Sequence, residues 1–181
     1  CGTLFPYTTL FRSDEAAALG RLLLSWIDAH CTALLPEALR GRLADSLSRE
    51  DSLLRMLHYP PLTGGEPAGA VRAAAHEDIN LLTLLPVSSQ PGLQVLGRDG
   101  RWRDVPGGPG DVIVNSGDML QEATARRMPS TSHRVVNPPA AAANRSRISM
   151  PYFLAPELGL RLSDRYTAGS YLRERLDQLA R

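Results

Sequence analysis

Residues 80–105 read NLLTLLPVSSQPGLQVLGRDGRWRDV, and their apolar runs and turns indicate the fold class of the chain. It contains the apolar runs NLLTLLPV and GLQVL, and the turn sequence GRDG (97–100) separates the second run from RWRDV. Short apolar runs that are bounded by Gly, Pro and Ser are typical of strands, and a Gly-containing turn between two of them indicates a hairpin. The stretch therefore predicts antiparallel β structure.

Short apolar runs of the same kind occur on both sides of this stretch. Comparable runs are SLLRMLHY (52–59), AVRAAAH (70–76), DVIVNSGD (111–118), STSHRVV (130–136) and SRISMPYFL (146–154). Seven or more short strands at such spacing predict an all-β sandwich or a jelly roll. We expect this β domain to occupy residues 51–165.

Helical patterns flank the predicted β domain. In the segment 14–50 an apolar stripe recurs at helical spacing, and Ser13 or Asp14 is a candidate cap for its first helix. The stripe consists of Leu19, Leu22, Leu23, Trp26 and Ile27. A second helix is expected in segment 166–181 from about Thr167, with its leucines (Leu172, Leu176, Leu179) on one face.

The first thirteen residues are set aside. Residues 3–13 read TLFPYTTLFRS, which resembles the translation of a sequencing-library adapter, although a Thr- and Tyr-rich strand is the alternative. We interpret residues 1–13 as an artefact that carries no information about the fold. The natural N-terminus is then expected to be missing.

Length and composition exclude several classes of protein and of chemistry. A chain of 181 residues suits one domain, and its 20 basic and 19 acidic residues give no field that favours nucleic acid or an anionic membrane. No apolar run approaches the roughly 18 residues of a membrane span. The two cysteines are too few for a disulfide framework or a cysteine-based zinc site, so a cytoplasmic location is expected. Because the chain contains no lysine, lysine chemistry is excluded.

Two histidines and one aspartate form a candidate metal site. His76 and Asp78 are two residues apart, so in a strand they point to the same face, and His133 in STSHRVV is the natural third ligand. Two imidazoles and a carboxylate are the facial triad of non-haem Fe(II) sites, although zinc fits the same geometry. Without His133, the interpretation of His76 and Asp78 as an exposed surface pair is as well supported as a metal site. His30 and His58 lack partners at ligand spacing and are interpreted as structural.

A second group of polar residues suits an anionic co-substrate. Arg147 and Ser149 share one face of a predicted strand, and Tyr59 ends the run before Pro60 and Pro61. A guanidinium and two hydroxyls are the donors that the distal carboxylate of a dicarboxylate needs. Without the metal site, a solvated Arg147 and a core Tyr59 are the preferred interpretations.

Taken together, these motifs resemble a known family. HYPP (58–61), HED (76–78), GLQVL (92–96), VNSGDML (114–120), STSHRVV and RISMPYF (147–153) resemble the isopenicillin N synthase-like 2-oxoglutarate/Fe(II)-dependent oxygenases from about Leu53 to Phe153. The resemblance implies a mainly β fold with flanking helices and a double-stranded β-helix (jelly-roll) core. It implies that His76, Asp78 and His133 bind iron, and that Arg147 and Ser149 bind 2-oxoglutarate with Tyr59 nearby. Leu57 departs from the pattern, because plant members usually have Asn there.

The resemblance also implies an activity. The chain is expected to oxidise a C–H bond of an unidentified small molecule with O2 and 2-oxoglutarate, releasing succinate and CO2. One rival is an oxidase of the isopenicillin N synthase type, in which Arg147 and Ser149 hold a carboxylate of the substrate instead. Another rival is a truncated, non-catalytic jelly-roll module. The sequence identifies neither the substrate nor the oligomeric state.

Other residues carry weaker expectations. Phe153 either lines the substrate cavity or packs in the core, and Arg55 is expected to be solvated rather than to meet an acidic substrate. Glu77 should point away from the metal. The segment Asn115, Gly117, Asp118 is expected to form a turn, and Met119 with Leu120 to lie in the core.

Overall fold

A computed structural model describes the backbone of residues 5–139 and 144–180, and side chains from residue 14 onward within these ranges. The helices are α1 (Phe5–His30), α2 (Asp118–Ala123) and α3 (Ala168–Leu179), with short 3-10 turns η1 (Thr32–Leu34) and η2 (Glu37–Leu39). The strands are β1 (Leu53–Leu54), β2 (Leu57–Tyr59), β3 (Ala73–His76), β4 (Leu82–Pro86), β5 (Leu93–Leu96), β6 (Trp102–Asp104), β7 (Val112–Ser116), β8 (His133–Val135), β9 (Arg147–Ser149) and β10 (Tyr152–Leu154).

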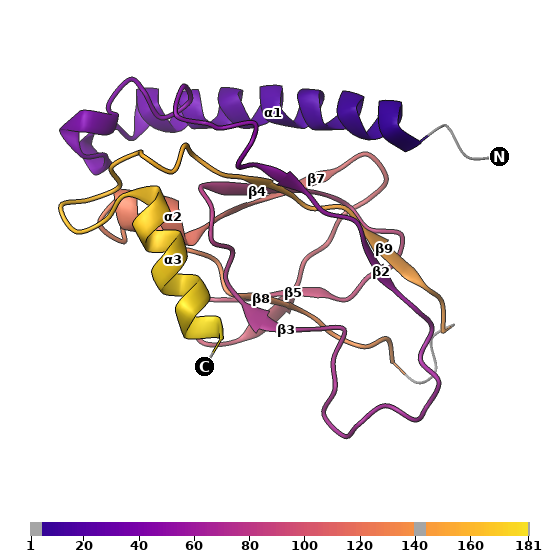
Figure 1. Cartoon of the computed structure of the whole chain (residues 1–181). Coiled ribbons are helices and arrows are strands. Elements are labelled where there is room, and N and C mark those ends of the chain that lie inside the picture. Colours follow the sequence, from indigo (N-terminus) through magenta and orange to yellow (C-terminus); the bar gives the residue numbers. More distant parts are fainter. Residues whose placement is uncertain (1–4, 140–143, 181) are drawn as a thin grey trace.

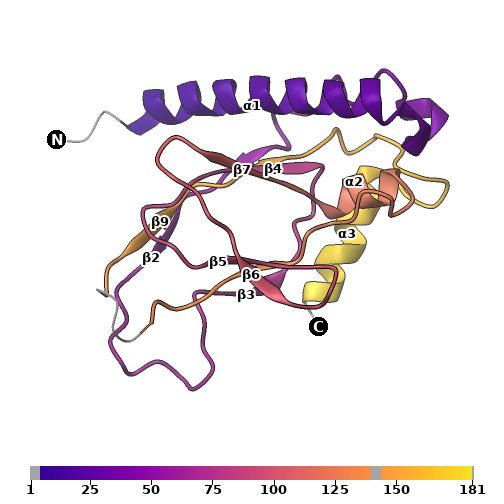
Figure 2. The same cartoon turned by 180° about the vertical axis from the view of Figure 1, so that it is seen from behind.

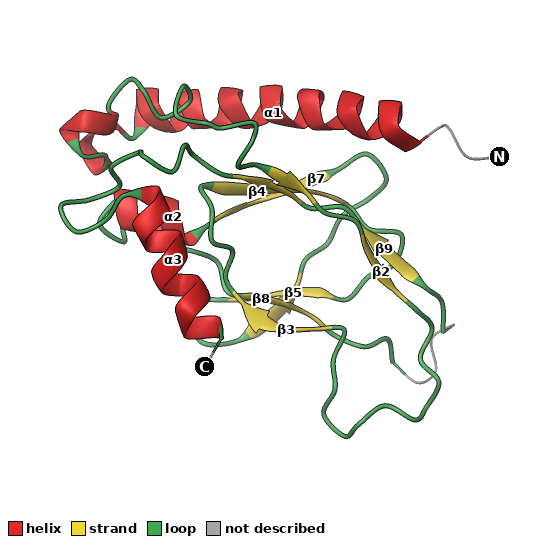
Figure 3. Cartoon of the chain, viewed as in Figure 1, coloured by secondary structure: helices red, strands yellow, loops and turns green. Residues whose placement is uncertain are grey.

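Two antiparallel sheets face each other. One has the strand order β1-β10-β4-β7 and the other β3-β8-β5-β6, while β2 pairs with β9 at one end. In Figures 1 and 3, α1 lies across the outside of the β4–β7 layer, and α2 and α3 lie at the end opposite β2 and β9. Figure 2 shows the same two layers from behind, with β6 beside β5. The expected jelly roll with flanking helices is therefore confirmed.

Alternation along the strands separates an outer face from an inner one. In β4, Leu84 and Pro86 face α1, whereas Thr83 and Leu85 face the space between the sheets. The main core lies on the outer face, where leucines from α1, β4 and β10 meet those of the η2 region. The inner face is consequently free to carry polar side chains.

The predicted hairpin is confirmed. β5 pairs with β6, the Gly97 N–H donates to the Arg101 carbonyl at 2.8 Å, and Gly100 closes the turn at φ +75°. A positive φ of this kind favours glycine.

Three helix and strand expectations need correction. Helix α1 begins at Phe5, so Ser13 and Asp14 lie inside it rather than at its start. Its predicted stripe is rotated, because Trp26 is 53% exposed while Leu24 is fully buried. The buried Asp28 carboxylate fixes this orientation by accepting the backbone N–H groups of Gly41 and Leu43, each at 2.7 Å.

The third correction concerns the run SLLRMLHY. The run is divided into β1 and β2 because these pieces pair with different strands, β10 and β9. Helix α3 begins as predicted after Thr167, which forms a capping box with Ser170. On the face that carries its leucines, Leu176 and Leu179 are exposed. Among the described residues, no helix has the length and apolarity that crossing a bilayer requires.

Candidate metal centre

The three predicted ligands come together between the sheets. His76 ends β3 and His133 begins β8, and these two residues are directly paired across the β3–β8 ladder. Asp78 lies beyond the end of β3, in the connection that crosses to β4 in the other sheet. The expectation that one strand carries both His76 and Asp78 is therefore wrong in detail, although the side chains still converge.

The ligand atoms surround one point. Asp78 Oδ1 lies 3.8 Å from His76 Nε2 and 3.7 Å from His133 Nε2, and one ligand atom from each residue lies within 4.8 Å of the other two. Both Asp–His distances exceed a hydrogen bond, so the atoms face a shared space rather than one another. This is the only such cluster of His, Cys, Asp and Glu side chains among the described residues.

Backbone carbonyls select the tautomer of both histidines. His76 Nδ1 lies 2.8 Å from the Ala74 carbonyl oxygen, and His133 Nδ1 lies 2.9 Å from that of Thr131. A carbonyl only accepts, so each Nδ1 carries the proton and each Nε2 presents its lone pair to the cluster. Metal-binding histidines are held in this way in proteins.

The predicted co-substrate residues lie on the β2–β9 pair. Tyr59 is paired with Arg147, and the guanidinium carbon lies 5.4 Å from the centre of the tyrosine ring. Arg147 is 2% exposed, and burial lowers its pKa. Its Nε–H donates to the Gln90 carbonyl at 3.1 Å, but Nη1 is buried without a hydrogen-bond partner among the described residues. A buried guanidinium nitrogen of this kind requires an acceptor.

Both groups line one inner cavity of about 60 Å³. Its lining includes all six predicted residues, namely His76, Asp78, His133, Arg147, Ser149 and Tyr59. Leu85, Leu93 and Arg147 also line an adjoining cavity of about 660 Å³, so Arg147 stands between the two spaces. Phe153 lines the inner cavity, which is one of the two positions expected for it.

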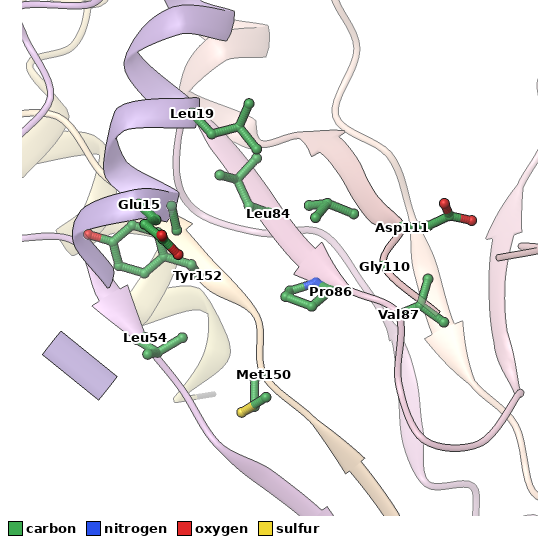
Figure 4. Close-up of a pocket in the computed structure, with 12 residues that line it drawn as sticks. Glu15, Leu19, Leu54, Leu84, Pro86, Val87, Gly110, Asp111, Met150 and Tyr152 are labelled. Carbon is green, nitrogen blue, oxygen red and sulfur yellow. The ribbon is translucent and has the colours of Figure 1, made fainter. Parts of the chain in front are cut away.

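A separate cavity of about 500 Å³ lies on the outer face. Figure 4 shows Leu84, Pro86 and Tyr152 facing it below α1, with Glu15 and Leu19 on the helix. These strand residues alternate with the inward-facing ones, so the sheet separates this cavity from the metal cluster. The smaller inner cavity is the candidate site because it holds the polar groups.

The structure corrects the role expected for one residue and adds two residues that were not predicted. Asn115 was expected in a turn, but it lies in β7, lines the inner cavity and donates to Asp78 Oδ2 at 3.0 Å. Sequence reasoning also missed Thr83, which donates to the same oxygen at 2.6 Å, and Ser88, which donates to Ser149 Oγ at 3.1 Å. A threonine at an inward position of the apolar run NLLTLLPV was the available signal for Thr83.

The remaining sequence expectations lie outside the inner cavity. Arg55, His30 and His58 are exposed, and Met119 and Leu120 are core residues as predicted. Glu77 does not line the inner cavity, and burial together with the neighbouring Asp118 carboxylate raises its pKa.

Residues 50–156 match the family model of the 2OG-Fe(II) oxygenase superfamily. The chain belongs to this superfamily. A curated relative, gibberellin 2-beta-dioxygenase 2 of Oryza sativa subsp. japonica, is 36% identical over 157 residues. The match covers 74% of this chain and 41% of that protein, so the chain spans less than half the length of this relative.

Solved structures of the superfamily share the fold. A Shewanella oneidensis protein provisionally named an oxygenase has a TM-score of 0.83 and 46% identity, over 99% of this chain and 67% of that one. A full-length Neurospora crassa protein, crystallised in complex with alpha-KG, has a TM-score of 0.78 and 28% identity, over 98% of this chain and 58% of that one.

Proposed function

We propose that this chain is the core of an Fe(II)- and 2-oxoglutarate-dependent oxygenase that oxidises a C–H bond of a small molecule with O2. One observation carries the proposal: a His–Asp–His cluster and the unpartnered Nη1 of a buried arginine line the same cavity. The first group suits a metal ion and the second suits a carboxylate. A dicarboxylate co-substrate would bind the metal ion at one end and the arginine at its other end, so it would occupy both groups.

The donor set fits Fe(II). His76 and His133 offer neutral imidazole nitrogens, and Asp78 adds one negative charge and a hard oxygen ligand. When bound, Fe(II) and 2-oxoglutarate supply the activation of O2 and the oxidative decarboxylation that releases succinate and CO2. The three residues would hold the ion from one side, which leaves its other side for co-substrate and O2.

The second group would bind and orient the dicarboxylate. Arg147 would hold the distal carboxylate through Nη1, and Ser149 would add its hydroxyl proton, since the Ser149 oxygen already accepts from Ser88. The Tyr59 ring flanks the guanidinium. Leu85, Leu93 and Phe153 add apolar lining to the cavity, which lowers the local dielectric and strengthens the contacts of both polar groups.

Relatives support the class of reaction but not one substrate. The Neurospora crassa protein was crystallised with alpha-KG, and the Oryza sativa relative is a dioxygenase by name. We infer a small-molecule substrate from these relatives. We also propose a cytoplasmic location, because two cysteines and a ferrous site suit a reducing compartment.

The test measures succinate formation under air with Fe(II) and 2-oxoglutarate, with and without candidate substrates. We expect O2-dependent succinate release in the wild type and none in His76→Ala. The matched control is His58→Ala, because His58 is exposed and lies outside the cavity lining. O2 consumption without any need for 2-oxoglutarate would favour the oxidase alternative. Failure of the wild type to bind Fe(II) would favour the non-catalytic module.

A further inference from the structure

The two carboxylate oxygens of Asp78 have different surroundings. Oδ1 faces the Nε2 atoms of His76 and His133 across 3.8 and 3.7 Å. Oδ2 accepts two hydrogen bonds, from Thr83 Oγ1 at 2.6 Å and from Asn115 Nδ2 at 3.0 Å. One oxygen is therefore available as a ligand, and the other is already engaged.

The sheet register brings the two donors together. Thr83 in β4 is paired directly with Asn115 in β7, and both side chains point to the inner face. Neighbours across an antiparallel pair lie about 5 Å apart, close enough for both to reach a single oxygen. A slip of β7 by one residue against β4 would turn Asn115 to the outer face, away from Thr83 and Asp78.

A third residue fixes the direction of the threonine proton. Asn80 Nδ2 donates to Thr83 Oγ1 at 2.9 Å, so the hydroxyl oxygen is used as an acceptor and its own proton is left for Asp78. Thr83 and Asn80 are 3% and 1% exposed, so water does not compete for these bonds. The chain from Asn80 through Thr83 to Asp78 thus has one orientation.

We propose that Thr83 and Asn115 are positioning residues that hold Oδ2 of Asp78 and leave Oδ1 as its single metal-binding atom. A carboxylate binds a metal through one oxygen or both, and the second mode occupies a further coordination position. Engaging Oδ2 keeps that position for the co-substrate. This inference rests on the proposed function, because it concerns the same metal site.

The test measures Co(II) binding by calorimetry and by visible absorption, which reports the coordination of the ion. The variants are Thr83→Val, which keeps the shape and removes the hydroxyl, Thr83→Ser, which restores it, and Asn115→Leu. The matched control is Thr124→Val, because Thr124 is also a fully buried threonine whose hydroxyl is hydrogen-bonded, but it lies in the α2 region. The unfolding temperature of each metal-free protein is measured in parallel.

We expect Co(II) to bind about 10–100-fold more weakly to Thr83→Val and Asn115→Leu, with an altered spectrum, as is usual when partners of metal ligands are removed. Thr83→Ser and Thr124→Val should resemble the wild type in affinity and spectrum. Because Asn115→Leu tests the role independently, misfolding of one variant leaves the proposal testable.

Two results would overturn the positioning role: unchanged Co(II) affinity in both variants, or an equal loss of affinity in Thr124→Val. A wild-type protein that binds no Co(II) would instead overturn the proposed function.

Discussion

At the scale of single residues, Arg147 is the clearest test of the co-substrate site. Its Nη1 is buried without a partner among the described residues, so the metal-loaded protein should bind 2-oxoglutarate through it. A charge-assisted hydrogen bond contributes about 1.5–3 kcal/mol. We therefore expect Arg147→Ala to weaken 2-oxoglutarate binding by about tenfold to a hundredfold in calorimetry on Mn(II)-loaded protein, while Arg55→Ala has no effect because Arg55 is exposed. Equal affinities in the two variants would contradict this assignment.

Ser88 provides a second test at this scale. Its hydroxyl donates to Ser149 Oγ at 3.1 Å and so leaves the Ser149 proton free to point into the cavity. In Ser88→Ala this orientation is lost, and we expect a loss of about threefold to tenfold in 2-oxoglutarate affinity, equivalent to a net hydrogen bond of about 0.5–1.5 kcal/mol. The affinity for succinate, measured by calorimetry in competition with 2-oxoglutarate, should fall by a similar factor. Affinity at the wild-type level would show that Ser149 needs no such partner.

At the scale of elements, the start of α2 fixes the connection that carries Asp78. The N–H groups of Asp118 and Met119 donate to the carbonyls of Asp78 and Asn80 at 2.8 and 3.0 Å, which satisfies donors that a helix start leaves free. A Cβ on Gly117 would overlap the side chain and carbonyl of Asn80, and it would come within 2.8 Å of the Asp78 carbonyl.

Gly117→Ala should therefore push this connection away from α2. We expect a destabilisation of about 1–3 kcal/mol, the usual cost of overpacking, measured by urea unfolding. Co(II) affinity should fall as well, because Asp78 moves with the connection. Gly159→Ala is the control, since a Cβ there meets no atom within 4 Å. Equal stability of the two variants would show that the contact relaxes at little cost.

The elements also explain what the sequence could predict. Strand positions and the hairpin at Gly97–Gly100 follow from local turn chemistry and apolar runs, so they were predicted. The rotation of α1 depends on Asp28, whose partners Gly41 and Leu43 lie beyond the helix. The spacing of apolar residues indicates that Trp26 is buried, but this spacing contains no information about the hydrogen bonds of Asp28. The structure therefore differs from the prediction, and Trp26 is exposed.

In the site, too, short sequence motifs predict some residues, whereas others depend on which strands pair. The spacing of His76 and Asp78 and the strand motif around Arg147 were readable, because a short polar motif in an apolar segment is conspicuous. The pairing of Thr83 with Asn115 was not readable, because it depends on which strands become neighbours in the sheet. The role predicted for Asn115 was wrong for this reason.

At the scale of the whole molecule, the metal site links the two sheets. His76 and His133 belong to one sheet, and Asp78 lies in the connection that enters the other, so an ion bound by all three requires the folded jelly roll. A ligand that binds only the native state raises the free energy of unfolding, by about 2.7 kcal/mol at a hundredfold excess over Kd. For a chain of this size each kcal/mol raises Tm by about 2–4 °C.

We therefore expect Co(II) at a hundredfold excess over Kd to raise the Tm by about 5–10 °C in calorimetric scans of the wild type. His76→Ala should abolish this shift while leaving the metal-free Tm nearly unchanged, because the His76 side chain is 48% exposed and contributes little to packing. The same scan with Mg²⁺ controls for ionic strength, since two imidazoles suit Mg²⁺ poorly. A Tm that does not respond to Co(II) in the wild type would mean that the three side chains do not act together on one ion, and the link between the sheets would then depend on the protein contacts alone.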